Sequence, residues 1–256
     1  WLAGESGAKR VLKDRLGRSI ENVASIRPPR HGKDLRTSID LRLQYLAYRT
    51  LKSAIKTHNA RSGSIVVLDV KTGEVLAMVN QPTYNPNDRS QLAAERYRNR
   101  AITDIFEPGS SLKPLVVAAA LESGQYRPSS IVDTAPGYIV VGPKKIEDSR
   151  NLGRVSLTTI LARSSNVGIT KLAMTLQPDQ LWETMTHFGL GELTTSGFPG
   201  ESAGMLTHYS NWRPISQATL AYGYGVSVTP LQLAQAYAAL GSAGEMRPVS
   251  LVALDA

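Results

Sequence analysis

Cysteine is absent from the chain, which excludes thiol catalysis and disulfide bonds. Long apolar runs are also missing, because no stretch approaches the roughly 18 apolar residues that a membrane-spanning helix needs. There is no starting methionine and no signal peptide, and a chain that opens on Trp-Leu-Ala-Gly is expected to be part of something longer. Basic and aromatic residues are not regularly interleaved, so we expect no nucleic-acid partner.

The composition fits a soluble globular protein, with 42% hydrophobic and 20% charged residues. A length of 256 residues suffices for one large domain, or for a domain with a small additional piece. The net charge of +8 belongs to one end: residues 1–60 hold 13 Lys and Arg against 5 Asp and Glu, whereas the remainder holds 16 of each sign. This basic excess indicates either a solvated surface or contact with an anionic membrane surface or polymer.

The most informative stretch is residues 106–116. Pro108-Gly109 predicts a turn, and the apolar run from Leu115 to Leu121 predicts a buried helix that ends at Gly124. Pro114 is tolerated only in a first turn, so the helix should begin near Ser110 or Ser111. Ser110 and Lys113 then share one face of that first turn.

This pairing of a hydroxyl with an amine suits a nucleophile and its base. A serine hydroxyl reacts only when a neighbouring base takes its proton. A lysine becomes such a base when burial and the positive end of a helix lower its pKa, and the same helix end would stabilise a developing oxyanion. The spacing also occurs at Ser6…Lys9 and Ser53…Lys56, but neither pair has a buried helix behind it.

The remaining elements follow from periodicity and capping. Asp40 is expected to cap a helix over about residues 41–59. Residues 64–80 predict a β-hairpin, and residues 125–155 contain short strand-like runs. Further helices are expected from Ser156 to about Leu176 with a break, over 180–188 and over 231–240, with a Gly-rich loop over 194–210.

The break in the helix after Ser156 is a second polar cluster, Ser164-Ser165-Asn166. Ser164 and Asn166 lie two residues apart, so both can face one cleft. A hydroxyl there could relay a proton between Lys113 and a leaving amine, and an amide could hold both a substrate carbonyl and the lysine. Ser149-Arg150-Asn151 has the same Ser-x-Asn pattern, but a plain loop or cap explains it.

Four further stretches strengthen this pattern. They are Asn99-Arg100-Ala101 leading to Phe106-Glu107-Pro108-Gly109-Ser110, Ser165-Asn166-Val167-Gly168, Gly197-Phe198-Pro199-Gly200-Glu201, and Tyr222-Gly223-Tyr224-Gly225 leading to Thr229-Pro230-Leu231-Gln232-Leu233-Ala234. Together with Ser-x-x-Lys and Ser-x-Asn, they resemble class B penicillin-binding proteins, and most of all the cell-division (septal) D,D-transpeptidases, over roughly residues 30–250.

The resemblance implies an α/β (α+β) fold of the penicillin-binding protein transpeptidase and serine β-lactamase type, an antiparallel sheet flanked by helices. Residues 1–34 would be the end of an N-terminal pedestal or linker, and residues 35–256 the transpeptidase domain. The resemblance makes Ser110 the acylated nucleophile and Lys113 its base, with Ser164 and Asn166 as the second motif. Tyr222, Tyr224 and Gly225 would bind substrate, although Tyr222 and Tyr224 could equally be a packed core pair.

The resemblance also implies a reaction and its setting. The activity would be D,D-transpeptidation of peptidoglycan stem peptides through an acyl-serine, with β-lactam antibiotics acylating the same serine. It implies no metal or organic cofactor. It places the protein at the periplasmic side of the bacterial inner membrane, among membrane proteins of the divisome.

One motif departs from the family order. The Lys71-Thr72-Gly73 triplet precedes the nucleophile and predicts a hairpin turn, so the third active-site motif and the C-terminal strands are expected beyond Ala256. Two alternatives therefore stay open. One is a serine hydrolase, a β-lactamase or carboxypeptidase, although neither Glu183 nor Glu201 sits in the loop motif that deacylation would require. The other is a non-catalytic scaffold fragment.

Overall fold

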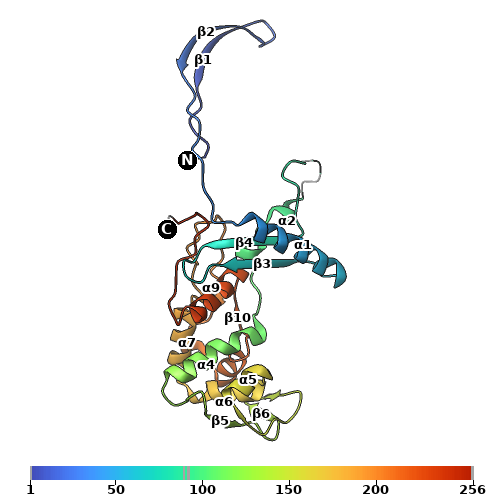
Figure 1. Ribbon diagram of the computed structural model, residues 1–256, viewed down its shortest axis with the longest axis vertical. Coiled ribbons are helices and arrows are strands. Elements are labelled where there is room, and N and C mark those ends of the chain that lie inside the picture. Colours follow the sequence, from blue (N-terminus) through green and yellow to red (C-terminus); the bar gives the residue numbers. More distant parts are fainter. Residues whose placement is uncertain (1, 89, 91–92, 255–256) are drawn as a thin grey trace.

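An N-terminal β-ribbon stands apart from the rest of the chain (Figure 1). In the computed structural model, which describes residues 2–88, 90 and 93–254, strand β1 (Ala8–Lys13) pairs antiparallel with β2 (Ser19–Arg27). Asp14 closes the turn between them by accepting bonds from the backbone N–H groups of Leu16 and Arg18. Residues 1–34 thus contain a β-ribbon, while their assignment to the end of a pedestal or linker stays a prediction.

The remaining strands form two-stranded antiparallel pairs, and helices account for most of the other regular structure. The strands are β3 (Gly63–Leu68), β4 (Val75–Gln81), β5 (Ile131–Asp133), β6 (Tyr138–Val141), β7 (Lys144–Glu147), β8 (Arg154–Ser156), β9 (Met205–Leu206) and β10 (Val226–Ser227). The helices are α1 (Leu41–Thr57), α2 (Ala94–Tyr97), α3 (Arg100–Thr103), α4 (Lys113–Glu122), α5 (Leu157–Ala162), α6 (Asn166–Thr175), α7 (Pro178–His187), α8 (Pro214–Leu220) and α9 (Pro230–Gly241).

The hairpin of β3 and β4 lies between two helices, α1 on one face and α9 on the other. Alternation along the strands explains this placement, since successive side chains point to opposite faces. Ala77 and Val79 pack with Leu51 of α1, whereas Val66 and Met78 face the side of α9. As expected, Asp40 caps α1, accepting bonds from the backbone N–H groups of the first turn.

The Lys71-Thr72-Gly73 triplet forms the turn of this hairpin, as predicted. The carboxylate of Asp69 accepts bonds from the backbone N–H groups of Lys71 and Thr72. Gly73 has a positive φ of 80°, and a Cβ there would lie 2.2 Å from the carbonyl oxygen of Pro248. Turn geometry and close packing therefore account for the triplet.

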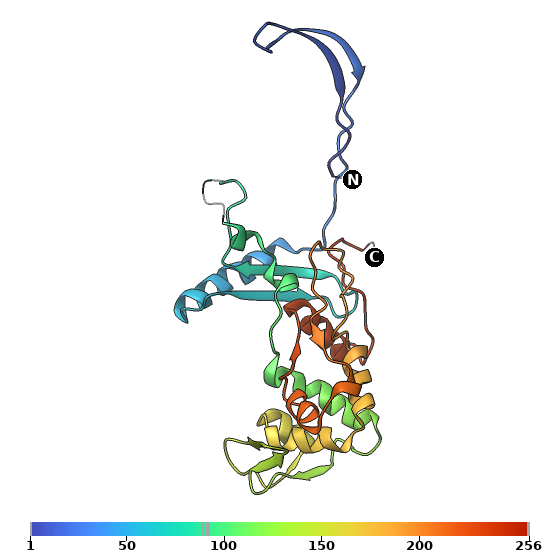
Figure 2. The ribbon, with the colours of Figure 1, turned by 180° about the vertical axis from the view of Figure 1, so that it is seen from behind.

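The other half of the molecule is helical and is organised around α4 (Figure 2). Most residues of α4 are buried, and the helix packs against α5, α6 and α7. A helix that is apolar on every side must be surrounded by other elements, and its position is therefore fixed by several neighbours at once. The small sheets β5–β8 and β6–β7 cover the end of this half near α5 and α6.

Most predicted elements are confirmed, with small shifts at their ends. The helix predicted over residues 180–188 begins earlier, at Pro178, because a proline suits a first turn. Helix α8 was missed, although Pro214 gives the same start signal. Among the described residues, none of the helices combines the length and apolar character that crossing a bilayer requires.

Candidate functional site

The nucleophile turn, defined here as residues 106–112, places Ser110 at the solvent-exposed mouth of α4. Gly109 has a positive φ of 57°, and a single 3₁₀ turn over Gly109–Leu112 leads directly into the α-helix at Lys113. The predicted start near Ser110 or Ser111 therefore falls inside this 3₁₀ turn. The neighbouring Ser111 points elsewhere, because its hydroxyl donates to the carbonyl oxygen of Pro108 at 2.6 Å.

Lys113 is the central side chain of the site. It is only 1% exposed, yet its amine finds three acceptors. Lys113 Nζ lies 2.6 Å from the carbonyl oxygen of Ser164, 2.9 Å from Ser164 Oγ and 2.8 Å from Asn166 Oδ1. The structure thus brings together three of the four residues singled out from the sequence as catalytic candidates, and the fourth, Ser110, shares a pocket with Ser164 and Asn166.

The burial of this amine changes its acidity. Removal from water disfavours the ammonium form and lowers the pKa of Lys113 to about 8, while the negative charge of Asp148 acts in the opposite direction. At pH 7 the lysine is therefore neutral in about a tenth of the molecules, far more than for an ordinary lysine. A neutral amine has a lone pair that can accept a proton.

The broken helix presents Ser164 in a conformation that is unusual for a residue with a side chain. Helix α5 ends at Ala162, and Ser164 adopts a positive φ of 54°. Ser165 then caps α6, its hydroxyl accepting a bond from the backbone N–H of Gly168. A left-handed serine persists only where its surroundings enforce it, and such residues cluster at functional sites.

Asp148 holds this break in place, and the sequence reasoning missed it. Its carboxylate accepts bonds from the hydroxyl of Ser165 and from the backbone N–H groups of Asn166 and Val167, at 2.6, 2.6 and 3.1 Å. Asp148 lies just after the end of β7, far along the chain from the residues that it binds, so the local pattern gave no signal for it. A negative charge at the N-terminus of α6 also interacts favourably with the helix dipole.

We expect Asp148→Ala to lower the free energy of unfolding by about 1.5–3 kcal/mol, because a charged acceptor of three bonds at a helix terminus is lost. Urea unfolding followed by circular dichroism measures this. Asp133→Ala is the matched control, since Asp133 accepts one local bond from the backbone N–H of Ala135. Equal losses in the two variants would contradict a special role for Asp148.

The pocket in front of Ser110 is polar and has a volume of about 610 Å³. Its lining residues come from the nucleophile turn, from the loop after β7 and from the break between α5 and α6. They are Ser110, Asp148, Ser149, Arg150, Leu152, Ala162, Arg163, Ser164 and Asn166. Ser149 thus reaches the pocket, whereas Asn151 of the same Ser-x-Asn pattern binds the backbone N–H of Gly153, as a loop residue does.

A second segment, residues 222–228, supports the nucleophile turn from behind. The backbone N–H of Gly109 donates to the carbonyl oxygen of Gly223, and the backbone N–H of Gly225 donates to the carboxylate of Glu107. Phe106 and Val228 exchange backbone hydrogen bonds. The position of Ser110 therefore depends on a segment more than a hundred residues further along the chain.

We expect Gly223→Ala to displace this turn and to lower the free energy of unfolding by about 2–4 kcal/mol. A Cβ at residue 223 would lie 1.9 Å from the carbonyl oxygen of Gly109, and φ there is +84°. Gly225→Ala is the matched control: its φ is +78°, but the nearest atom to its Cβ is 3.9 Å away. Urea unfolding of both variants isolates the contact with Gly109, and equal destabilisation would show that only backbone strain matters.

The two tyrosines of this segment have different surroundings. Tyr222 is 7% exposed and belongs to the main hydrophobic core, whereas Tyr224 is 50% exposed. Their ring centroids lie 5.6 Å apart in an edge-to-face arrangement. Tyr222 thus packs in the core, whereas Tyr224 reaches the surface. The substrate-binding role predicted for Tyr222, Tyr224 and Gly225 stays a prediction.

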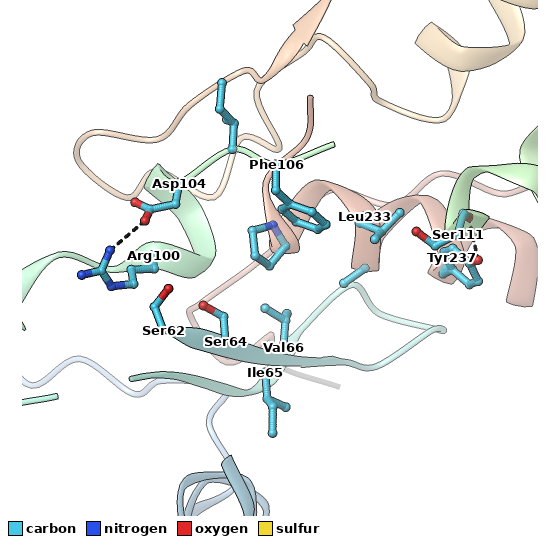
Figure 3. A pocket seen from close by; sticks show the side chains of 14 residues that line it. Ser62, Ser64, Ile65, Val66, Arg100, Asp104, Phe106, Ser111, Leu233 and Tyr237 are labelled. Atoms are coloured by element: carbon cyan, nitrogen blue, oxygen red, sulfur yellow. Dashed lines mark hydrogen bonds and ion pairs between the residues drawn. The ribbon is translucent and has the colours of Figure 1, made fainter. Parts of the chain in front are cut away.

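A second, larger groove of about 730 Å³ lies between β3 and α9, beside residues 104–106 (Figure 3). Ser64 and Val66 point from β3 toward Phe106 and Leu233, while Ile65 points to the opposite face. The Arg100–Asp104 ion pair lies at one end, and Tyr237 lies at the other, where its hydroxyl donates to the carbonyl oxygen of Ser111. Neither Ser110 nor Lys113 lines this groove, so it is separate from the polar pocket.

The geometry agrees with the comparisons to known proteins. Residues 63–255 match the family described as the penicillin binding protein transpeptidase domain. The chain belongs to this family, as a class B member. Over 255 residues it is 46% identical to the peptidoglycan D,D-transpeptidase FtsI of Escherichia coli K12, covering 100% of this chain and 43% of that protein. It is 43% identical over 251 residues to the probable peptidoglycan D,D-transpeptidase PenA of Neisseria flavescens, covering 97% and 62%.

Solved structures of penicillin-binding proteins agree in fold. The apo transpeptidase domain of penicillin-binding protein 3 from Burkholderia pseudomallei aligns with a TM-score of 0.78 and 41% identity, covering 86% of this chain and 62% of that one. The expected family and fold class are thereby confirmed. This penicillin-binding protein chain spans less than half the length of its FtsI relative, 43% of it.

The glutamates considered for deacylation have other surroundings. The carboxylate of Glu201 accepts bonds from the backbone N–H and the hydroxyl of Thr194 and from the hydroxyl of Ser196. Glu183 lies on α7 beside the end of α4, where it shares a small cavity with Glu122 and His187. Neither residue lines the pocket of Ser110, so this penicillin-binding protein places no glutamate there among the described residues.

Proposed function

We propose that this chain carries the acylation machinery of a peptidoglycan D,D-transpeptidase. The observation that supports this most is the buried amine of Lys113, held by Ser164 and Asn166 and placed one helical turn from Ser110. In the first step Ser110 Oγ attacks the carbonyl carbon of the D-Ala–D-Ala peptide bond of a stem peptide. The C–N bond breaks, the terminal D-Ala leaves as an amine, and an acyl-serine ester remains.

The path of the protons follows from the hydrogen-bond donors and acceptors around Lys113. An ammonium donates to all three acceptors, whereas a neutral amine has only two N–H donors and one lone pair. The carbonyl oxygens of Ser164 and Asn166 accept only, so they hold the two donors, and the lone pair is left for a hydroxyl. We assign this lone pair to the proton of Ser110. The hydroxyl of Ser164 gives its proton to the leaving nitrogen and takes one back from the Lys113 ammonium, which becomes neutral again.

The second step reverses these roles. The amine of a neighbouring stem peptide attacks the ester carbonyl, and the proton that it loses passes through Ser164 Oγ to Lys113. The bond to Ser110 Oγ breaks, and Ser110 takes its proton from Lys113. The backbone N–H of Ser110 has no acceptor within residues 2–88, 90 and 93–254, and it lies at a helix N-terminus, so it can donate to the oxyanion that forms in each step. A β-lactam would acylate Ser110 in the same way and leave slowly.

The setting of this activity is also a proposal. The relatives named peptidoglycan D,D-transpeptidases support peptidoglycan stem peptides as substrates. From the resemblance to the septal enzymes we also propose a role in cell division at the periplasmic side of the inner membrane, with divisome membrane proteins as partners. The activity requires none of the known organic cofactors, because the proton transfers and the nucleophile come from the side chains named above.

The function is tested by intact-mass analysis of the full-length protein after exposure to benzylpenicillin. We expect a single penicilloyl group, mapped by proteolysis to the peptide that contains Ser110, with a lifetime of minutes or longer. Turnover of the adduct within seconds would assign the protein to the hydrolases instead. Failure to gain mass under any condition would favour the non-catalytic scaffold.

A further inference from the structure

The pocket in front of Ser110 contains two arginines, Arg150 and Arg163. Arg163 follows the last turn of α5 and directly precedes Ser164, while Arg150 lies in the loop after β7, two residues beyond Asp148. Both residues are exposed and both line the pocket. The two arginines reach the pocket of Ser110 from different parts of the chain, so their positions are set independently.

Neither guanidinium has a hydrogen-bond or ion-pair partner in the part of the chain that the structure describes, residues 2–88, 90 and 93–254. Other arginines near an acidic side chain are paired: Arg42 binds Asp40, Arg100 binds Asp104 and Arg247 binds Glu245. The two pocket arginines therefore keep their donors available.

The acidic side chain in the same pocket does not neutralise them. The carboxylate of Asp148 accepts three bonds from Ser165, Asn166 and Val167, which leaves it committed to the N-terminus of α6. The pocket thus contains two guanidinium groups without partners in the described residues and one carboxylate that already accepts three hydrogen bonds. A guanidinium presents a planar fork of N–H donors, which matches the two oxygens of a carboxylate.

We propose that Arg150 and Arg163 form a subsite for a carboxylate on the acyl portion of the donor. This inference rests on the function proposed above. A donor bound to Ser110 and Asn166 has its acyl chain in this pocket, and a polar cavity of about 610 Å³ accommodates a peptide-like chain. A free carboxylate along that chain would meet both arginines, so the subsite favours acidic stem peptides over neutral ones.

The test compares two penicillins that differ by one carboxylate on the acyl side chain, carbenicillin and benzylpenicillin. Second-order acylation constants are measured at low and high salt for the full-length protein and for Arg150→Ala and Arg163→Ala. We expect the ratio of the carbenicillin constant to the benzylpenicillin constant to fall about threefold to tenfold in each variant at low salt, with the modest size set by solvent exposure. Arg→Lys at either position should recover part of the ratio, and salt should lower it in the wild type.

Arg127→Ala is the matched control, since Arg127 is exposed, carries the same charge and does not line the pocket of Ser110. It should leave the ratio unchanged. An unchanged ratio in the pocket variants, or an equal loss for both penicillins, would overturn the subsite while leaving the transpeptidase function intact. Absence of any adduct on the wild type would overturn the proposed function and the subsite with it.

Discussion

We expect the Ser110→Ala variant to form no covalent adduct with benzylpenicillin and to remain folded. The methyl group has no lone pair with which to attack a carbonyl. Of the other two serines that line the pocket, Ser164 is bound to Lys113, and Ser149 lies in the loop after β7 and is not among the hydrogen-bond partners of that lysine. Ser110 is exposed and its hydroxyl makes no hydrogen bond within the described residues, so we expect the free energy of unfolding to change by less than about 0.5 kcal/mol. Intact-mass analysis and urea unfolding measure the two quantities.

Ser111→Ala is the matched control, because it removes a hydroxyl from the adjacent residue. That hydroxyl donates to the carbonyl oxygen of Pro108 and belongs to the wall of the separate groove along α9. The variant should keep its adduct and lose about 0.5–1.5 kcal/mol of stability with the hydrogen bond. If Ser110→Ala still formed an adduct, or if only Ser111→Ala failed to form one, the nucleophile would be a serine other than Ser110.

Replacing Lys113 by methionine should slow acylation by about a hundredfold to ten-thousandfold, which is the usual contribution of a general base. Methionine fills a similar volume, so the buried helix is retained while the base is removed. Lys113→Arg should fare no better, because a guanidinium stays protonated at every accessible pH and cannot accept the proton of Ser110. Lys56→Met is the matched control, since Lys56 belongs to the exposed Ser53…Lys56 pair on α1.

The same base predicts the pH dependence of the wild type. The pKa of Lys113 is lowered to about 8 by burial, and only the neutral amine can act. The acylation rate should therefore rise with pH, about tenfold per unit below pH 8, and reach a plateau above it. Asp148 favours the ammonium form, so Asp148→Asn should move this rise to lower pH. A flat profile between pH 6 and about 9 would remove Lys113 from the role of base.

Several features of this site could be predicted because they depend on neighbours in sequence. The spacing of Ser110 and Lys113 places them on one helix face, and Pro114 limits where that helix can begin. Ser164-Ser165-Asn166, after α5, can be recognised in the sequence because these three small polar residues interrupt an apolar helical pattern. The hairpin turn at Gly73 could likewise be separated from the active site, because its signal is local turn chemistry.

Other features could not be predicted because they arise from contacts between segments that are distant in sequence. Nothing near Asp148 indicates that it binds the N-terminus of α6, and no spacing rule places Gly223 against Gly109. The different burial of Tyr222 and Tyr224 also depends on what packs around residues 222–228 and not on their own pattern. In each case the contacting residue is distant in sequence, so the contact can be identified only from the tertiary structure.

By itself, the sequence singled out Ser110, Lys113 and the Ser164-Ser165-Asn166 break as candidate site residues, because helix periodicity and turn chemistry act over a few residues. Only the tertiary structure decided how the site is completed: that Lys113 is buried on the carbonyl and hydroxyl of Ser164 and on Asn166, that Asp148 fixes the break, and that Arg150 and Arg163 enter the same pocket. The physical reason is that the pKa of a buried amine and the charge of a pocket depend on every group packed around them, whatever the distance along the chain.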